Sequence, residues 1–227
     1  MSKRLSKEEL ESDPLIENYN RAVSYYIDNK SRILSIAIAV VVLLGSFFGY
    51  QYFSSAQESQ AQELLSIAEA AYANGEFEEA LYGNDFELTY GFDQIADEFP
   101  WTNAGNLANY YAAVSSFELG DVDNALMYMN EFSVPRGILG VGPLTFHAKL
   151  HLAKEDYTAA ADKFLQAAEW NENDVTTPSN LYEAAQAHYS AENYDRATEL
   201  VNRVINEYPE SSKFAESQRL KGMLAAN

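Results

Sequence analysis

A run of 21 residues from Ile33 to Phe53 contains no charged side chain, and none occurs between Arg32 and Glu58. At a rise of about 1.5 Å per residue, a helix of this length spans the hydrocarbon core of a bilayer, which is about 30 Å thick. A buried helix of a soluble protein rarely runs this long without a polar face. The segment 33–53 therefore predicts a transmembrane helix.

The residues that flank this segment predict its direction. Lys30 and Arg32 precede it, whereas the far side carries only Ser, Ala and Gln before Glu58. Positively charged flanks stay in the cytoplasm, so residues 1–32 are expected inside and the bulk of the chain outside. Aromatic residues at 50, 52 and 53 cluster at the outer end, where rings favour the headgroup level.

A cleaved signal peptide is the alternative for the same segment. Ser54 and Ala56 fit the small-x-small rule for cleavage after Ala56. The apolar region of a signal peptide is usually about 7–15 residues long and follows a short basic leader. Here both the apolar run and the 32-residue leader are longer, which favours a retained anchor while leaving cleavage as an alternative.

The leader 1–32 is expected to contain a short amphipathic helix. Asp13 and Pro14 form a helix start, with an acidic cap followed by proline in the first turn. The apolar residues Ile16, Tyr19, Val23, Tyr26 and Ile27 then fall on one face. Two interpretations stay open: a face that lies on the inner leaflet or on a membrane partner, and a solvated extension of the anchor.

Charge divides the chain at the apolar segment. The net charge of −19 comes entirely from residues beyond it, because the first 32 residues carry six basic and six acidic side chains. So acidic a chain is not expected to bind nucleic acid, whose phosphates it would repel. There is no cysteine, which excludes disulfides and thiolate metal sites.

The region from Ala61 onward shows a helical repeat. Helical stretches of about a dozen residues are separated by short Gly, Asp or Asn turns. Four pairs of alanines stand twelve residues apart, with a large residue three before the second alanine: Ala68 and Ala80, Ala113 and Ala125, Ala148 and Ala160, Ala185 and Ala197. Paired alanines let two antiparallel helices approach closely, as in the tetratricopeptide repeat, a helix-turn-helix unit of about 34 residues.

The repeat pattern predicts an all-α fold for residues 54–227. We expect a tetratricopeptide-repeat α-solenoid of about four degenerate repeats, closed by a C-terminal capping helix after Pro209. The first unit holds about eight extra residues, which fall within 81–92. They are expected to form a loop or to break the second helix, either as a partner contact or as a harmless bulge.

The whole layout resembles one bacterial family, that of the ancillary subunit of the Sec translocon SecYEG. The resemblance rests on the segments YGNDFELTYGFDQIADEFP, TNAGNLANYYAAVSSFELGDVDNALMYMNEF and NDVTTPSNLYEAAQAHYSAENYDRATELVNRVINEYP. It implies a single-pass inner-membrane protein with a cytoplasmic N-terminus and a periplasmic repeat domain. The implied partners are SecYEG and periplasmic chaperones or their clients. A periplasmic scaffold for envelope assembly or cell division is the alternative.

The repeat register predicts a concave groove lined by the first helix of each unit. Three positions per unit are expected to point inward, at −3, +1 and +4 relative to the first alanine of each pair. They are Leu65, Glu69, Tyr72, Tyr110, Val114, Phe117, Thr145, Lys149, Leu152, Tyr182, Gln186 and Tyr189. An aromatic stripe of this kind suits extended apolar or aromatic peptides, although some of these side chains could instead pack between helices.

The sequence offers little sign of catalysis. His147 and His151 form an i, i+4 pair that could hold zinc, but the glutamate of a zinc-protease motif is missing because Ala148 follows the first histidine. No glycine-rich phosphate loop and no local serine-hydrolase motif is present. We therefore expect no enzymatic activity, no cofactor and no small-molecule substrate, with a metal-dependent enzyme using the two histidines as the remote alternative.

Overall fold

The computed structural model describes residues 14–226, so the expected cap at Asp13 lies outside the described residues. The chain separates into two compact units, 1–56 and 57–227.

Helix α2 runs from Pro14 to Ala73 and carries the apolar segment. Asn29 alone departs from helical geometry, with φ −115° and ψ 15°. Its side-chain Nδ2 donates to the carbonyl oxygen of Tyr25 at 2.9 Å, the acceptor that its own backbone N–H would use in a regular helix. This competition accounts for the kink between the leader helix and the apolar segment.

The apolar part of α2 is long and apolar enough to cross a membrane, by length and composition. None of the side chains in its most apolar stretch is buried within the structure. Leu43 and Phe48, for example, are 68% and 65% exposed. A core helix of a soluble protein would bury such side chains, so this interpretation of the segment is not supported.

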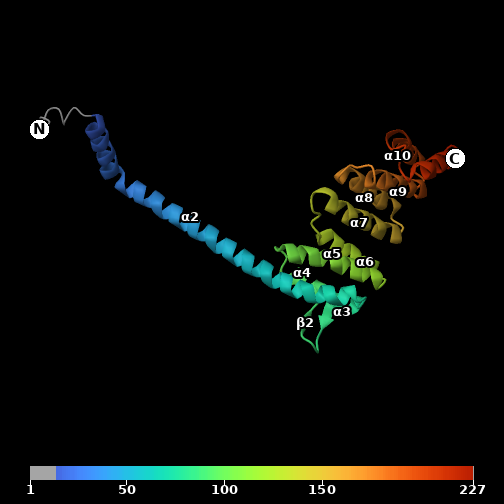
Figure 1. The fold of residues 1–227 in the computed structure, drawn as a ribbon, viewed down its shortest axis with the longest axis horizontal. Coiled ribbons are helices and arrows are strands. Elements are labelled where there is room, and N and C mark those ends of the chain that lie inside the picture. Colours follow the sequence, from blue (N-terminus) through green and yellow to red (C-terminus); the bar gives the residue numbers. More distant parts are fainter. Residues whose placement is uncertain (1–13, 227) are drawn as a thin grey trace, which may run out of the picture. The chain divides into compact units, whose positions relative to one another are not determined.

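The second unit is a stack of antiparallel helix pairs (Figure 1). The part of α2 from residue 57 pairs with two short helices, α3 and α4, and three further pairs and a last helix follow. Their bounds are α3 Phe77–Tyr82, α4 Phe92–Glu98, α5 Asn103–Glu118, α6 Val122–Glu131, the 3-10 helix η1 Gly137–Gly140, α7 Val141–Ala153, α8 Tyr157–Trp170, α9 Thr176–Ser190, α10 Tyr194–Glu207 and α11 Phe214–Leu224.

The eight alanines that define the repeat lie where the helices of each pair cross. All are buried, and Ala68 is the most exposed of them at 3%. A larger side chain at any of these positions would push the two helix axes apart. The predicted α-solenoid of four repeats is thus confirmed, and α11 packs against the last pair through Leu220 and Leu224.

The turn between the helices of each pair has the same geometry in all four repeats. One residue per turn adopts positive φ, five residues before the second alanine: Gly75 (80°), Gly120 (83°), Glu155 (58°) and Glu192 (58°). The backbone N–H groups of this residue and the next donate back to the last turn of the preceding helix, as in the Schellman motif. This repeated cap stops each first helix and reverses the chain.

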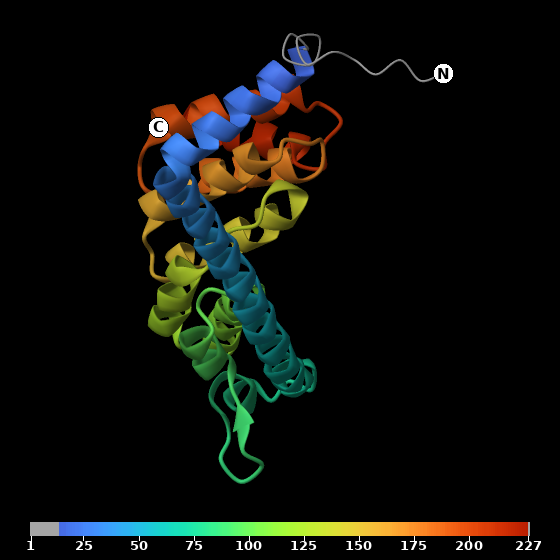
Figure 2. The same ribbon diagram turned by 90° about the vertical axis from the view of Figure 1, so that its left-hand side faces the viewer.

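The extra residues in the first repeat form a β-hairpin (Figure 2). Strand β1 (Gly83–Asn84) pairs antiparallel with β2 (Thr89–Tyr90), between α3 and α4. The expected break in the second helix is therefore present, but the hairpin itself was not predicted, because strands of two residues are too short to show alternation. At its base, a Cβ on Gly91 would lie 2.2 Å from the Leu81 carbonyl oxygen, so only glycine fits there.

Candidate peptide-binding groove

A groove of about 730 Å³ lies between α7 and α9, the first helices of the third and fourth repeats. Tyr110 of α5 and Ile138 of η1 contribute to its wall. Its other lining residues are Val141, Gly142, Thr145, Phe146, Lys149, Leu152, Phe164, Val175, Thr176, Ser179, Asn180 and Glu183. Mixed apolar and polar lining of this size accommodates a short stretch of extended peptide.

A hydrogen bond across the groove floor joins its two helices. The Thr145 hydroxyl lies 2.8 Å from Asn180 Oδ1 and 2.9 Å from the Val141 carbonyl oxygen, so the two acceptors share its one proton. Asn180 Nδ2 donates to the Thr176 carbonyl oxygen at 3.0 Å. Asn180 is only 4% exposed, so leaving its amide unpaired would be costly. The bond fixes the orientation of the amide and holds α7 and α9 in register.

The groove carries one charge of each sign. Lys149 of α7 is exposed, and Glu183 of α9 is half-buried. Glu183 Oε1 lies 3.8 Å from Lys213 Nζ, which also pairs with Glu216 at 2.8 Å. Hydrogen bonding to Glu216 raises the pKa of Lys213, which therefore stays charged beside the groove at neutral pH. The groove thus presents charges of both signs beside a lining of mixed polarity.

The structure gathers four of the twelve predicted groove residues at this cavity: Tyr110, Thr145, Lys149 and Leu152. Leu65 and Tyr182 lie in the hydrophobic core, at 6% and 7% exposed. The remaining six do not line this cavity: Glu69, Tyr72, Val114, Phe117, Gln186 and Tyr189. Gln186 Nε2 instead donates to the Tyr182 hydroxyl at 2.9 Å.

Several of the predicted aromatic residues belong to a packed network between repeats. Tyr72 contacts Tyr111 with ring centroids 5.1 Å apart, and Tyr111 stacks on Phe92 at the same distance. Tyr110 continues the network to Phe146 at 6.0 Å, and burial raises the pKa of Tyr110. These aromatic residues pack between neighbouring repeats and stabilise their stacking. Packing between helices was the alternative to a peptide-binding stripe.

The repeat pattern did not predict which residues of α9 line the groove. The repeat register assigned the same three positions to every first helix, but a groove between two neighbouring helices uses opposite flanks of each. Ser179, Asn180 and Glu183 stand six, five and two residues before Ala185, outside the assigned positions. Gly142 and Phe146 stand six and two before Ala148 in α7, so this second stripe was present in the sequence.

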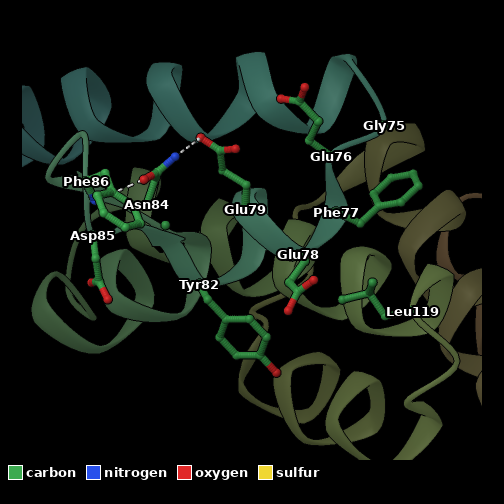
Figure 3. A pocket seen from close by; sticks show the side chains of 11 residues that line it. Gly75, Glu76, Phe77, Glu78, Glu79, Tyr82, Asn84, Asp85, Phe86 and Leu119 are labelled. Atoms are coloured by element: carbon green, nitrogen blue, oxygen red, sulfur yellow. Dashed lines mark hydrogen bonds between the residues drawn. The ribbon is translucent and has the colours of Figure 1, made fainter.

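A second cavity, of about 620 Å³, lies along α3 beside the hairpin (Figure 3). Its lining includes four carboxylates and no basic side chain: Glu76, Glu78, Glu79 and Asp85. Asn84 Nδ2 donates to Glu79 Oε1 at 3.2 Å and ties the hairpin to α3 (Figure 3). Phe86 at the hairpin tip is fully exposed. This lining disfavours anionic ligands.

The two histidines of α7 pack together instead of opening toward a shared ligand. Their rings stack at 5.2 Å with an interplanar angle of 14°. His147 is 4% exposed, and burial lowers its pKa to about 4. His151 Nδ1 lies 3.7 Å from Asp156 Oδ2. Within residues 14–226, no group of three or more His, Asp or Glu side chains is arranged to hold a metal ion.

The helical repeats are similar to those of known proteins. A family model described as a tetratricopeptide repeat-like domain matches residues 26–133. The chain is also similar to the crystal structure of a variant kinesin light chain with nearly identical TPR-like repeats from Podosopora anserina. That similarity covers 74% of this chain and 85% of the other, with 14% identity and a TM-score of 0.52.

The second unit is a TPR-like solenoid. The structural similarity extends beyond the segment that the family model matches, and it concerns the fold alone. No curated protein matches the sequence. TPR-like folds typically serve as protein-interaction scaffolds without catalytic activity, so proteins are the class of partner that the fold indicates.

Proposed function

We propose that this protein is a single-pass membrane scaffold whose TPR-like unit binds extended segments of other proteins outside the cytoplasm. The groove between α7 and α9 is the observation that carries the proposal. It has the size for a short peptide, an apolar floor, and polar groups already fixed by the Thr145–Asn180 hydrogen bond. Fixed polar groups lower the entropic cost of binding a flexible segment.

The anchor in this proposal is the segment 33–53. Two observations support its retention: its apolar side chains are exposed, and Ser54 and Ala56 lie inside helix α2. Cleavage after Ala56 would require this stretch to leave its helix. Alkaline extraction of membranes tests the anchor. The full chain should stay in the pellet at its full mass, whereas release of a product beginning at Gln57 would overturn the anchor.

Lys30 and Arg32 support the proposed orientation, in which residues 1–32 lie in the cytoplasm and residues 54–227 in the periplasm of a bacterial inner membrane. Protease added to spheroplasts should degrade the repeats. The variant Lys30→Glu, Arg32→Glu should reduce this accessibility, while Lys3→Glu, Lys7→Glu, which changes charge far from the span, should not. Protection of the repeats in the unchanged protein would overturn the orientation.

The partner that we propose is the Sec translocon, with periplasmic chaperones or their clients as groove ligands. A scaffold at this site would meet unfolded chains, whose extended apolar segments suit the groove. Affinity purification of the full chain in mild detergent should recover SecYEG components. Recovery of envelope-assembly or cell-division proteins without them would favour the alternative scaffold.

A metal-dependent activity at His147 and His151 is the second candidate, and the structure gives it little support. Bound zinc measured on the purified chain, with His151→Ala for comparison, should be far below one ion per chain. A stoichiometric metal that is lost in the variant would contradict this expectation.

A further inference from the structure

Trp101 is the most exposed tryptophan in the chain. Its side chain is 94% exposed, in the turn between α4 and α5. A tryptophan side chain is rarely so exposed to solvent, because its ring has a large apolar surface. Trp170, by contrast, is half-buried and donates its indole N–H to the Pro135 carbonyl oxygen at 2.9 Å.

The backbone on both sides of Trp101 is held firmly. The Thr102 hydroxyl donates to the Phe99 carbonyl oxygen at 2.8 Å, and Thr102 Oγ1 accepts from the Gly105 N–H at 2.9 Å. Phe99 is buried at 6% exposed. A Cβ on Gly105 would lie 2.0 Å from the Phe99 carbonyl oxygen, so this close turn requires glycine. These contacts restrain the backbone position of Trp101.

Glu58 ties this turn to the end of the apolar segment. Its carboxylate accepts from the backbone N–H of Asn103 at 2.7 Å and from that of Ala104 at 3.3 Å. Glu58 stands only five residues after Phe53. Five residues reach at most about 18 Å when fully extended and about 7.5 Å when helical. Glu58, and with it the backbone next to Trp101, is therefore tied to the span by a chain segment no longer than about 18 Å.

We infer that Trp101 is a second membrane contact, which enters the headgroup region of the outer leaflet beside the anchor. The inference rests on the proposed transmembrane segment. The headgroup region is about 5–7.5 Å thick on each side of the hydrocarbon core, and five helical residues from Phe53 rise about 7.5 Å, to its outer edge. An indole ring suits this layer, because its apolar body and its N–H group meet lipid and water together.

The nearby charges indicate which lipids this contact tolerates. Glu58 and the exposed Asp97 and Glu98 lie close to Trp101 in the chain or in space, with no basic residue among positions 97–104. Anionic headgroups would be repelled, so the contact is expected with zwitterionic lipid. Trp101 then acts as a lateral anchor that limits how far the repeats can tilt away from the bilayer.

Depth-dependent fluorescence quenching tests this inference on the full chain in zwitterionic lipid nanodiscs. Spin labels are placed in the lipids near the headgroup, and acrylamide, which is neutral, probes exposure to water. The Trp101 signal is obtained by subtracting the spectrum of Trp101→Phe, which retains Trp170. A matched control is Val175→Trp in the Trp101→Phe background, since Val175 is 75% exposed and precedes α9 in the fourth repeat.

The Trp101 component should emit at shorter wavelength in nanodiscs than the Val175→Trp component. It should be quenched several-fold more by the spin-labelled lipid and several-fold less by acrylamide. Equal quenching of the two components in chains that co-elute with the discs would overturn the lipid contact and leave the anchor intact. Chains that elute apart from the discs would overturn the anchor and, with it, this inference.

Discussion

Each of the four repeat turns contains one residue with positive φ, which allows the chain to reverse. Two of these positions carry glycine and two carry glutamate, in the same Schellman geometry. A side chain with a Cβ is strained in the left-handed region, whereas glycine is not. The two glutamates therefore store a small strain that the two glycines avoid.

Replacing Glu155 with glycine should stabilise the repeat unit. Glu155→Gly is expected to raise the free energy of unfolding by about 0.5–1 kcal/mol, and Gly120→Ala to lower it by a similar amount. Urea unfolding of the full chain in mild detergent measures both. Gly222→Ala is the comparison: Gly222 lies inside α11 with open space around it and no positive φ, so its replacement should raise the free energy of unfolding, opposite in sign to Gly120→Ala. Loss of stability in Glu155→Gly would contradict this account of the turn.

His147 should make the stability of the repeats depend on pH. Burial lowers its folded-state pKa to about 4, while in the unfolded chain it is near the ordinary 6.5. The unfolded chain thus binds the proton first, so the stability contribution is complete above pH 6.5 and falls as the pH decreases toward 4.

Replacing this histidine should reduce the acid sensitivity. Between about pH 7.5 and pH 5, the unchanged protein should lose roughly 2 kcal/mol more than His147→Leu, measured by urea unfolding at each pH. His151→Leu is the control, because Asp156 opposes the effect of burial on the pKa of His151 and its contribution is smaller. Identical pH profiles for the unchanged chain and His147→Leu would refute the role of this residue.

At the scale of elements, α5 depends on a cap from outside its own helix. Thr102 caps the N–H of Gly105, and Glu58 accepts from the N–H groups of Asn103 and Ala104. A carboxylate at a helix N-terminus also interacts favourably with the helix dipole. The contact joins residues 45 positions apart and fixes the part of α2 from residue 57 to the second repeat.

Removing this cap should weaken the first two repeats. Glu58→Ala is expected to cost about 1–2 kcal/mol, and Glu58→Gln about half of that, because the amide keeps one acceptor oxygen but no charge. Glu63→Ala, on the same helix and exposed, should change the free energy of unfolding by less than about 0.5 kcal/mol. Equal effects of Glu58→Ala and Glu63→Ala in urea unfolding would show that the cap adds no stability.

The sequence was sufficient to predict the repeats because their signal is periodic. Ala113 and Ala125 must be small for the helices to cross, so all four repeats carry a pair of alanines at the same spacing, and Gly75 and Gly120 mark two of the four turns. The hairpin has no such signal. Its strands are two residues long. Gly91 is needed because the backbones approach closely in three dimensions, and Gly83 for the same reason and for its positive φ.

The groove was only partly predictable for a related reason. Thr145 and Lys149 follow from the register of their own helix, whereas Ser179 and Glu183 depend on how α9 is rotated against α7. That rotation results from packing across the whole interface, including the Thr145–Asn180 hydrogen bond. The sequence shows the repeated positions, six and two residues before the first alanine, but not that this packing turns them toward a groove.

For the molecule as a whole, we propose that one chain combines a membrane anchor with a peptide-binding groove. The apolar segment of α2 has the length of a membrane span, and the TPR-like unit presents one cavity with an apolar floor and charges of both signs. We expect this proposed scaffold to contact extended segments of its partners through the groove, because its lining combines apolar side chains with charges of both signs.

Site-specific photo-crosslinking in intact membranes tests this claim most directly. A photoreactive amino acid is placed in the groove at Lys149 or Ser179, and in second helices at Asp123 or Glu199, which are exposed. Our account predicts discrete protein adducts at the two groove positions, several-fold stronger than at the two control positions, and their loss when Phe146→Glu places a charge on the groove floor. Adducts of equal yield at all four positions, unaffected by Phe146→Glu in a chain that still folds, would contradict it.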